Sequence, residues 1–164
     1  MLRSRDAKKR LVVDGTVGTD AAGVAGAPVF SADGKRIAWS RGEREAMQMT
    51  VDGVAGEKHY GIGAVAFSPD GKRVAYAAWL GSDWTLVVDG VAQEPVKNTI
   101  DFILFSPDGS SVMTLMSGKS FALNGKPVGT FSAVALPRFS TDSKSLSFYA
   151  VQGLDVWWKT VPAR

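Results

Sequence analysis

The sequence predicts an all-β fold in which one small sheet is repeated about four times along the chain. Two short markers keep a common spacing through the copies, and hydrophobic residues between them alternate with the period of a β-strand. Turn-forming residues bound these alternating segments. Only the segment 41–49 resembles an amphipathic helix, and a glycine stands near its start. Together these observations predict a repeat protein built from strands.

The first marker is a Phe-Ser turn sequence that recurs at intervals of 37, 38 and 34 residues. In its clearest copy, Phe67 is followed by Ser-Pro-Asp-Gly. This order places proline where φ must be near −65° and glycine where φ must be positive. We expect Phe67 to be a core residue whose replacement by alanine costs about 3–5 kcal/mol. The four markers begin at Phe30, Phe67, Phe105 and Phe139.

The second marker is an Asp-Gly or Asn-Gly pair that precedes each Phe-Ser marker by 15 or 16 residues. Such pairs favour two-residue hairpin turns, because both central residues tolerate positive φ. Two markers in constant phase indicate one supersecondary unit per repeat. The pairs begin at Asp14, Asp52, Asp89 and Asn124.

One repeat contains four short strand patterns, which in the clearest copy cover residues 64–67, 73–79, 84–88 and 92–96. A lone four-stranded sheet of this size cannot bury both of its faces. Sheets that stack around a common axis can, so the sequence predicts a β-propeller of about four blades. We expect a basic flexible tail over 1–10 and a propeller domain over 11–164. Its predicted parts are N-terminal strands at 11–22 and blades at about 27–60, 64–97, 101–131 and 134–160.

The segment from Phe67 to Tyr76, Phe-Ser-Pro-Asp-Gly-Lys-Arg-Val-Ala-Tyr, resembles the PD40 or WD40-like repeat of TolB-type β-propellers. The looser copies match in the same frame, so the resemblance covers nearly the whole chain from Leu11. It implies a scaffold that in similar proteins serves as a periplasmic partner or as a gating domain of a peptidase. The chain lacks the Gly-His and Trp-Asp pairs of typical WD repeats, so the partners of that subfamily are not implied.

The number of strands leaves ring closure open. The chain opens inside a blade, at Leu11, and its last copy lacks a fourth strand after about Thr160. Four blades closed by their own ends, a fragment of a longer propeller, and two chains forming about eight blades all remain compatible with this pattern. An open arc exposes unpaired strand edges. We therefore expect a protein partner or self-association, with a homodimer as one form.

Charge and hydropathy exclude some classes of partner. The formal net charge is +3, but five of the 19 basic residues and only one of the 16 acidic residues lie within residues 1–10. The rest is close to neutral, so no nucleic-acid surface is predicted. No apolar run approaches the ~18 residues of a membrane span. The N-terminus has no apolar segment of signal-peptide length, which favours a cytoplasmic location if the chain is complete and otherwise leaves the compartment open.

Candidate binding residues fall in loops that a propeller places on one face. These are the loops between the second and third strands of each repeat and the loops that lead to the next repeat. Loops on a rigid scaffold are where binding residues concentrate. The predicted set is Arg41, Glu43, Arg44, His59, Tyr60, Asp83 and Lys119.

The sequence predicts no catalytic residue, cofactor or metal site. The chain has one histidine, no cysteine and no Gly-x-Ser-x-Gly sequence. Calcium ligation by the four turn aspartates is the alternative to turns that cap their own backbone, and one carboxylate per repeat favours the caps. The Gly-Lys-Ser sequence at Gly118 is interpreted as a loop between strands, since no helix follows it. The four aspartates are Asp33, Asp70, Asp108 and Asp142.

The five tryptophans allow either core packing or an aromatic groove for sugars or single strands. Trp39 occupies the place of Tyr76 and Phe148 in the other repeats, which predicts that it packs in the core. Trp157 and Trp158 are neighbours on a strand and point to opposite faces, which favours an interface with another blade or chain.

These residues favour a non-catalytic protein- or ligand-binding or assembly module. Its physical basis is a rigid scaffold with variable loops and no convergent nucleophile, base and oxyanion set. The alternative is an accessory or gating domain of a hydrolase, or of another enzyme, whose catalytic part lies outside this chain. A structural repeat protein that works by self-association is the third hypothesis. The ligand and the partner cannot be identified from the sequence.

Overall fold

The computed structural model describes residues 12–13, 16–17, 26–43 and 45–163, and these form strands and turns only. The predicted tail over 1–10 and Arg44 lie outside the described residues. Within the segment 41–49, Arg41 ends β4 and residues 47–49 belong to β5, so its described residues do not form the helix that was the alternative. No helix long and apolar enough to cross a bilayer occurs in the described part of the chain.

The strands form antiparallel sheets in which sequence neighbours pair, as the repeat predicts. The first is a hairpin of β1 (Val12–Val13) and β2 (Thr16–Val17). Sheet 1 contains β3 (Val29–Phe30), β4 (Ile37–Arg41), β5 (Met47–Val51) and β6 (Val54–His59). Sheet 2 contains β7 (Gly61–Phe67), β8 (Val74–Trp79), β9 (Trp84–Val88) and β10 (Val91–Ala92).

The next two sheets continue this order. Sheet 3 contains β11 (Ile100–Phe105), β12 (Val112–Met116), β13 (Ser120–Leu123) and β14 (Lys126–Thr130). Sheet 4 contains β15 (Ala133–Phe139), β16 (Ser145–Gln152) and β17 (Asp155–Pro162). It has three described strands, so the expected absence of a fourth strand in the last repeat is confirmed for the described residues.

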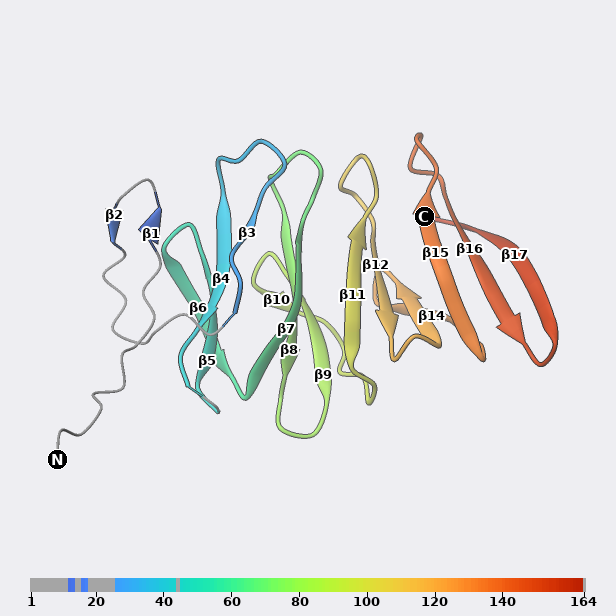
Figure 1. Ribbon diagram of the computed structural model, residues 1–164, viewed down its shortest axis with the longest axis horizontal. Coiled ribbons are helices and arrows are strands. Elements are labelled where there is room, and N and C mark those ends of the chain that lie inside the picture. The colour runs from blue at the N-terminus through green and yellow to red at the C-terminus, as the bar shows by residue number, and fades with distance from the viewer. Residues whose placement is uncertain (1–11, 14–15, 18–25, 44, 164) are drawn as a thin grey trace, which may run out of the picture.

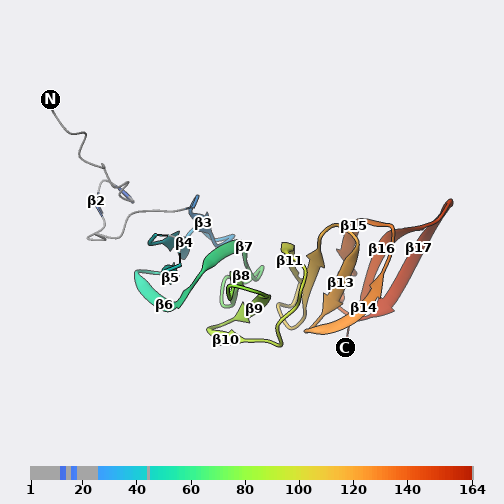
Figure 2. The ribbon, with the colours of Figure 1, turned by 90° about the horizontal axis from the view of Figure 1, so that it is seen from below.

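The sheets stand face to face in chain order, as Figure 1 shows, with the hairpin β1–β2 and strand β17 at opposite ends of the row. Seen from below, the row forms an open arc (Figure 2). The first strands of consecutive sheets meet, because β7 contacts both β3 and β11. Of the three arrangements that the sequence left open, the described strands therefore form a partial propeller and not a ring closed by its own ends.

Hydrophobic residues fill the space between consecutive sheets. One cluster joins sheets 1 and 2 around Met49 and Tyr76, a second joins sheets 2 and 3 around Leu86, and a third joins sheets 3 and 4 around Phe121 and Phe148. Each sheet thus covers the face of the next, which is the physical reason for the repeat.

The four marker phenylalanines, expected to be equivalent, differ in burial. Phe105 is 5% exposed, Phe67 and Phe139 are half-buried, and Phe30 is 54% exposed. The expectation that Phe67 is a fully buried core residue is therefore wrong in degree. It packs against the cluster between sheets 1 and 2 and also lies beneath the Arg36 guanidinium, 5.3 Å from its ring centre.

The turn aspartates cap their own backbone. The Ser68 hydroxyl donates to Asp70 Oδ1 at 2.6 Å and accepts from the Arg73 N–H at 2.9 Å, and Asp70 Oδ1 also accepts from the Lys72 N–H at 3.1 Å. The same pattern of bonds recurs in the other three repeats, which confirms that these aspartates cap their own turns. The equivalent Ser–Asp pairs are Ser31–Asp33, Ser106–Asp108 and Ser140–Asp142.

Replacing Asp70 by asparagine is expected to weaken the dependence of stability on acid pH. The Ser68 hydroxyl and then the Lys72 N–H hold the pKa of the Asp70 carboxyl below its ordinary value. Its stabilisation is present above that ordinary value and is lost as pH falls through the lowered pKa. Asparagine keeps the accepting oxygen and does not titrate. Urea unfolding between about pH 5 and pH 2 should show a smaller loss for Asp70→Asn; parallel curves would contradict the cap.

One arginine joins sheet 1 to sheet 2, and another joins sheet 2 to sheet 3. Arg73 Nε donates to Asp89 Oδ2 at 2.8 Å within sheet 2, and its Nη1 donates to the Gly109 carbonyl of sheet 3 at 2.9 Å. Arg36 makes the equivalent bonds to Asp52 and to the Gly71 carbonyl of sheet 2. The aspartate of the second marker therefore binds the arginine that donates to the next sheet.

Sheets 3 and 4 are joined differently. Ser111 and Asn124 occupy the positions that arginine and aspartate have in the earlier sheets. Both donate to the Ala163 carbonyl, at 2.9 and 3.2 Å, and Ala163 is fully buried. The residues that follow β17 thus occupy this junction in place of a guanidinium.

Candidate functional site

The predicted binding residues lie at the ends of strands and in the turns of sheets 1 to 3. Figure 1 shows the turns β4–β5 and β8–β9 along the lower edge of the row, where β6 also leads into β7. Arg41 ends β4, His59 ends β6, and Tyr60 stands between β6 and β7. Asp83 precedes β9, and Lys119 lies in the turn between β12 and β13.

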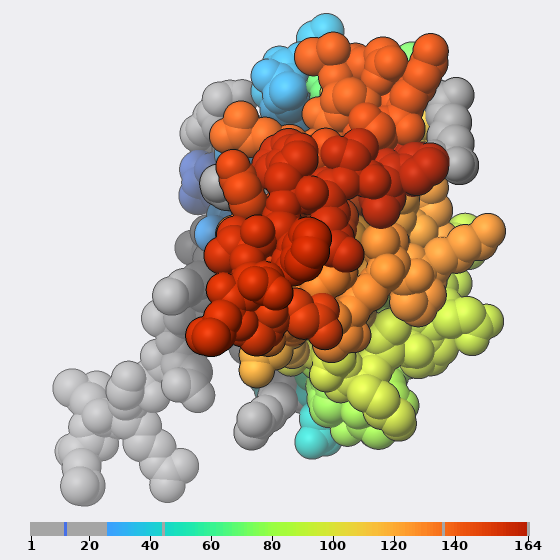
Figure 3. Space-filling model, turned by 90° about the vertical axis from the view of Figure 1, so that its right-hand side faces the viewer, coloured from blue at the N-terminus to red at the C-terminus, as the bar shows by residue number. Residues whose placement is uncertain are grey.

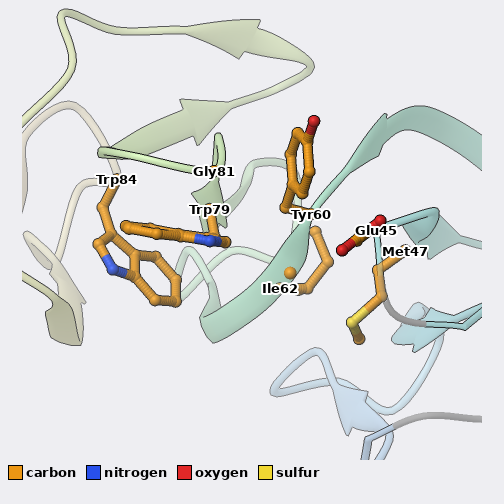
Figure 4. A pocket seen from close by; sticks show the side chains of 8 residues that line it. Glu45, Met47, Tyr60, Ile62, Trp79, Gly81 and Trp84 are labelled. Atoms are coloured by element: carbon orange, nitrogen blue, oxygen red, sulfur yellow. The ribbon is translucent and has the colours of Figure 1, made fainter.

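A cleft of about 630 Å³ opens between sheets 1 and 2 at this edge. Its walls combine aromatic, aliphatic and glycine residues with a single carboxylate, as Figure 4 shows. We call it the Tyr60–Trp84 cleft. Its lining residues are Glu45, Met47, Tyr60, Gly61, Ile62, Trp79, Gly81 and Trp84.

Two tryptophans from the hairpin β8–β9 form one side of the cleft. Trp79 and Trp84 pair directly across the strands, with ring centres 5.4 Å apart and planes inclined by 48°. Both side chains are half-buried, whereas Trp39 in sheet 1 is 8% exposed and confirms its predicted core position. The hairpin therefore presents two indoles at the surface of the cleft.

Gly63 of β7 leaves the room that the Trp84 indole occupies. A Cβ at Gly63 would lie 3.0 Å from Trp84 Cζ3, and one at Gly61 would lie 3.4 Å from Trp79 Cβ. Because 3.0 Å is tighter than ordinary van der Waals contact, a larger residue at Gly63 would displace the Trp84 ring.

Tyr60 and Glu45 complete the cleft from the side of sheet 1. The Tyr60 N–H donates to the Trp79 carbonyl at 2.9 Å, and the Glu45 N–H donates to the Tyr60 carbonyl at 3.3 Å. A Cβ at Gly81 would lie 3.2 Å from Tyr60 Cε2, so the ring packs closely over this glycine. Tyr60 is 49% exposed, and Glu45 is exposed with a φ of 69°. The backbone thus fixes a carboxylate beside an accessible aromatic ring.

Of the six predicted residues that the structure describes, only Tyr60 lines this cleft. The Arg41 Nη2 donates to Gln48 Oε1 at 3.4 Å, and Asp83 forms an ion pair with Lys97 at 2.8 Å. The hydrogen bond from Lys97, followed by the one from Ser82, holds the pKa of the Asp83 carboxyl below its ordinary value. Of the remaining predicted residues, Glu43 is exposed between β4 and β5, Lys119 belongs to sheet 3, and Arg44 is outside the described residues.

His59 lies in the interior and not in the cleft. It is 7% exposed, and its Nε2 lies 3.5 Å from the Tyr76 hydroxyl. The rings meet edge to face, with centres 6.0 Å apart. Burial raises the pKa of Tyr76, as does the nearby Glu57 carboxylate. This histidine therefore packs between sheets 1 and 2, in agreement with a structural role.

The titration of His59 should report this burial. Desolvation lowers the pKa of its imidazole below the ordinary value of 6.5, and the Glu57 carboxylate partly offsets the effect. Stability should therefore fall as pH drops below about 6.5 and the buried ring becomes charged. The chain has one histidine, so its NMR signal is unambiguous. Glu57→Gln should lower the pKa further, and a wild-type pKa above 6.5 would contradict the burial.

The cleft offers binding surfaces and no recognisable reaction centre. Among the described residues, no three histidine, aspartate or glutamate side chains lie close enough to hold a metal ion. Of the eight lining residues, one has a titratable carboxylate and one a phenol, and neither a histidine nor a serine accompanies them. Aromatic side chains beside a few polar groups are typical of a site that holds a ligand by contact area.

The arrangement of strands is similar to that of β-propellers of known structure. Hydrazine synthase of Kuenenia stuttgartiensis aligns with a TM-score of 0.52 and 19% identity, over 92% of this chain and 49% of that one. A prolyl endopeptidase aligns with a TM-score of 0.51 and 17% identity, over 83% of this chain and 28% of that one. These likenesses show the β-propeller fold that the repeat predicts.

TolB of Acinetobacter baumannii aligns with a TM-score of 0.48 and 18% identity, over 90% of this chain and 43% of that one. The chain spans about half the length, or less, of these three structures. No protein-family model and no curated protein sequence matches it. The comparisons therefore identify the β-propeller fold and assign no activity to this chain.

Proposed function

We propose that this chain is a non-catalytic binding module on a β-propeller scaffold and that the Tyr60–Trp84 cleft is its recognition site. The observation that carries the proposal is the exposure of aromatic side chains on the wall of a cleft between two sheets. Tyrosine and tryptophan are the residues that most often dominate binding energy at protein interfaces.

The local sequence supports this assignment. Gly61 and Gly63 weaken β7 as a strand, since glycine loses more backbone entropy on folding and offers no side chain to pack. In return, Gly63 leaves room for the Trp84 ring beside the cleft. A glycine that weakens the strand and makes room for an indole at the cleft favours a recognition role.

A role as an accessory domain of an enzyme is compatible with the same cleft. The chain covers only 28% of the prolyl endopeptidase, whose study concerns inter-domain dynamics in catalysis and specificity. A binding module that presents its cleft to a neighbouring domain would serve such an enzyme without providing catalytic residues. Both versions require the cleft to bind a polypeptide surface.

Selection of peptides from a displayed random library on the purified full chain tests the proposal. We expect enriched peptides to bind wild-type protein and to lose at least about ten-fold in affinity on Tyr60→Ala, as expected for an interface hot spot. Phe102→Ala is the matched control, because Phe102 is 45% exposed on β11 of sheet 3 and belongs neither to the cleft lining nor to the outer face of sheet 4. Peptides that bind both variants like the wild type would contradict the proposal.

We also propose that two copies of the chain associate through the outer face of sheet 4. Tyr149 and Trp158 lie opposite each other on β16 and β17, with ring centres 4.7 Å apart, and beside them Val156 is 67% exposed. Seen from this end, β15 to β17 form the surface of the molecule (Figure 3). In sheets 1 to 3, the equivalent face is covered by the next sheet. In the proposed dimer, a second chain covers this face of sheet 4.

Light scattering of the full chain tests this association. The wild type should have the mass of a dimer, and Trp158→Glu should be monomeric, because it places a charge in the apolar contact. Trp157→Glu is the matched control, since Trp157 is 52% exposed and points to the opposite face. A monomeric wild type, or equal effects of the two substitutions, would overturn the proposal.

A further inference from the structure

We infer that the Tyr60–Trp84 cleft recognises a cationic side chain, an arginine or lysine, of a polypeptide partner. The inference rests on the proposed function, which makes the cleft a recognition site, and adds the chemical class of its ligand. Three observations support it: the aromatic rings of the cleft, the negative charge of its described lining, and the cation–ring contacts that the chain forms elsewhere.

The rings suit a cation better than a neutral ligand. A guanidinium or ammonium group within about 6 Å of an aromatic ring centre is attracted to the ring face, and tryptophan is the strongest partner. Trp79, Trp84 and Tyr60 provide three such rings around one cleft. Besides the rings, the described lining provides the Tyr60 hydroxyl, the Glu45 carboxylate and the indole N–H groups of Trp79 and Trp84. Of these groups, the carboxylate is the one that favours a cation over a neutral ligand.

The described lining of the cleft carries a negative charge. Glu45 is the single charged residue among the described residues that line it. Of the basic residues around this edge, Lys97 pairs with Asp83 at 2.8 Å and Arg41 donates to Gln48 at 3.4 Å. An incoming cation would meet both a carboxylate and aromatic rings, and the partial exclusion of water in a cleft strengthens both attractions.

The chain already uses this contact between its own sheets. Arg36 lies 5.3 Å from the centre of the Phe67 ring, and Arg73 lies 5.6 Å from that of Phe105. Lys159 lies 5.4 Å from the Phe131 ring. None of these three contacts involves a ring of the cleft. A cation from a partner would make the same kind of contact there.

Titration of the full chain with capped Gly-Arg-Gly and Gly-citrulline-Gly peptides tests the inference, with two-dimensional NMR of the tryptophan indole N–H signals as readout. Citrulline keeps the shape of arginine and lacks its charge. We expect the arginine peptide to shift the Trp79 and Trp84 signals with an affinity at least about five-fold higher. Glu45→Gln should remove most of this preference. Glu94→Gln, which changes an exposed glutamate outside the cleft, should keep it.

The outcomes separate this inference from the proposed function. Equal affinities of the two peptides at the cleft, or an unchanged preference in Glu45→Gln, would overturn the cationic ligand and leave the binding site intact. Tighter binding of tetramethylammonium than of the arginine peptide would overturn the polypeptide source. A cleft that no library peptide perturbs would overturn the proposed function itself.

Discussion

Replacing Phe148 by alanine is expected to lower the free energy of unfolding by about 3–5 kcal/mol. Phe148 is 1% exposed in the centre of the cluster between sheets 3 and 4. Its ring meets Phe121 edge to face, with centres 4.4 Å apart, and lies 5.8 Å from Phe131. Alanine would leave a cavity that the rigid sheets on either side cannot close. Urea unfolding followed by circular dichroism, with linear extrapolation, measures the loss.

The adjacent residue provides the control for this substitution. Tyr149 is 41% exposed on the opposite face of β16, where it contacts Trp158. Tyr149→Ala should therefore cost about 1 kcal/mol or less, the worth of one cross-strand aromatic pair. Equal losses for the two variants would show that sheet 4 does not pack its Phe148 face onto sheet 3.

The second and third strands of the repeat could be predicted closely because their signals are local, whereas the fourth was predicted at 92–96 and β10 covers only Val91–Ala92. The third strand of sheet 2 was predicted at 84–88 and β9 has these bounds, and the second was predicted at 73–79 and β8 begins one residue later. The first strand was predicted from 64, whereas β7 begins at Gly61. Glycine has a low strand propensity, so Gly61 and Gly63 hid the start of β7.

The cleft could not be predicted because its residues come from separate segments of two sheets. Glu45 was missed since its role depends on a backbone conformation with positive φ. Trp79 and Trp84 were recognised only as members of a general aromatic set, and their spacing of five residues around a tight hairpin was the signal that places them side by side. His59 was selected with Tyr60, but neighbours at a strand end point to opposite sides, and only Tyr60 reaches the cleft.

The differences in burial among the marker phenylalanines could not be predicted from the repeat. Phe67 and Phe105 each lie under an arginine of the preceding sheet, and Phe30 is 54% exposed. The turn sequence is equivalent in these copies, so the difference comes from what stacks on each ring. Sequence alone specifies the turn, and the neighbouring sheet decides how deeply the marker is buried.

Arg73→Met should lower the free energy of unfolding by about 1–3 kcal/mol. Methionine keeps an unbranched stem and removes the guanidinium, which bonds to Asp89, to the Gly109 carbonyl and to the face of Phe105. The ion pair alone contributes little, because its side chains are 37% and 42% exposed and water screens them. Most of the expected loss therefore comes from the contacts across the sheets, which salt screens less.

Lys72→Met at the neighbouring position separates these contributions. The Lys72 side chain is 82% exposed, so its replacement should change stability by no more than about 0.5 kcal/mol. Raising the salt concentration to about 1 M should reduce the effect of Arg73→Met only slightly if the bond to Gly109 and the Phe105 contact dominate. An effect of Arg73→Met no larger than that of Lys72→Met would mean that apolar packing alone joins the sheets. Sheets 3 and 4, which have Ser111 in place of the arginine and an aromatic cluster between them, would then be joined in the same way as the other sheets.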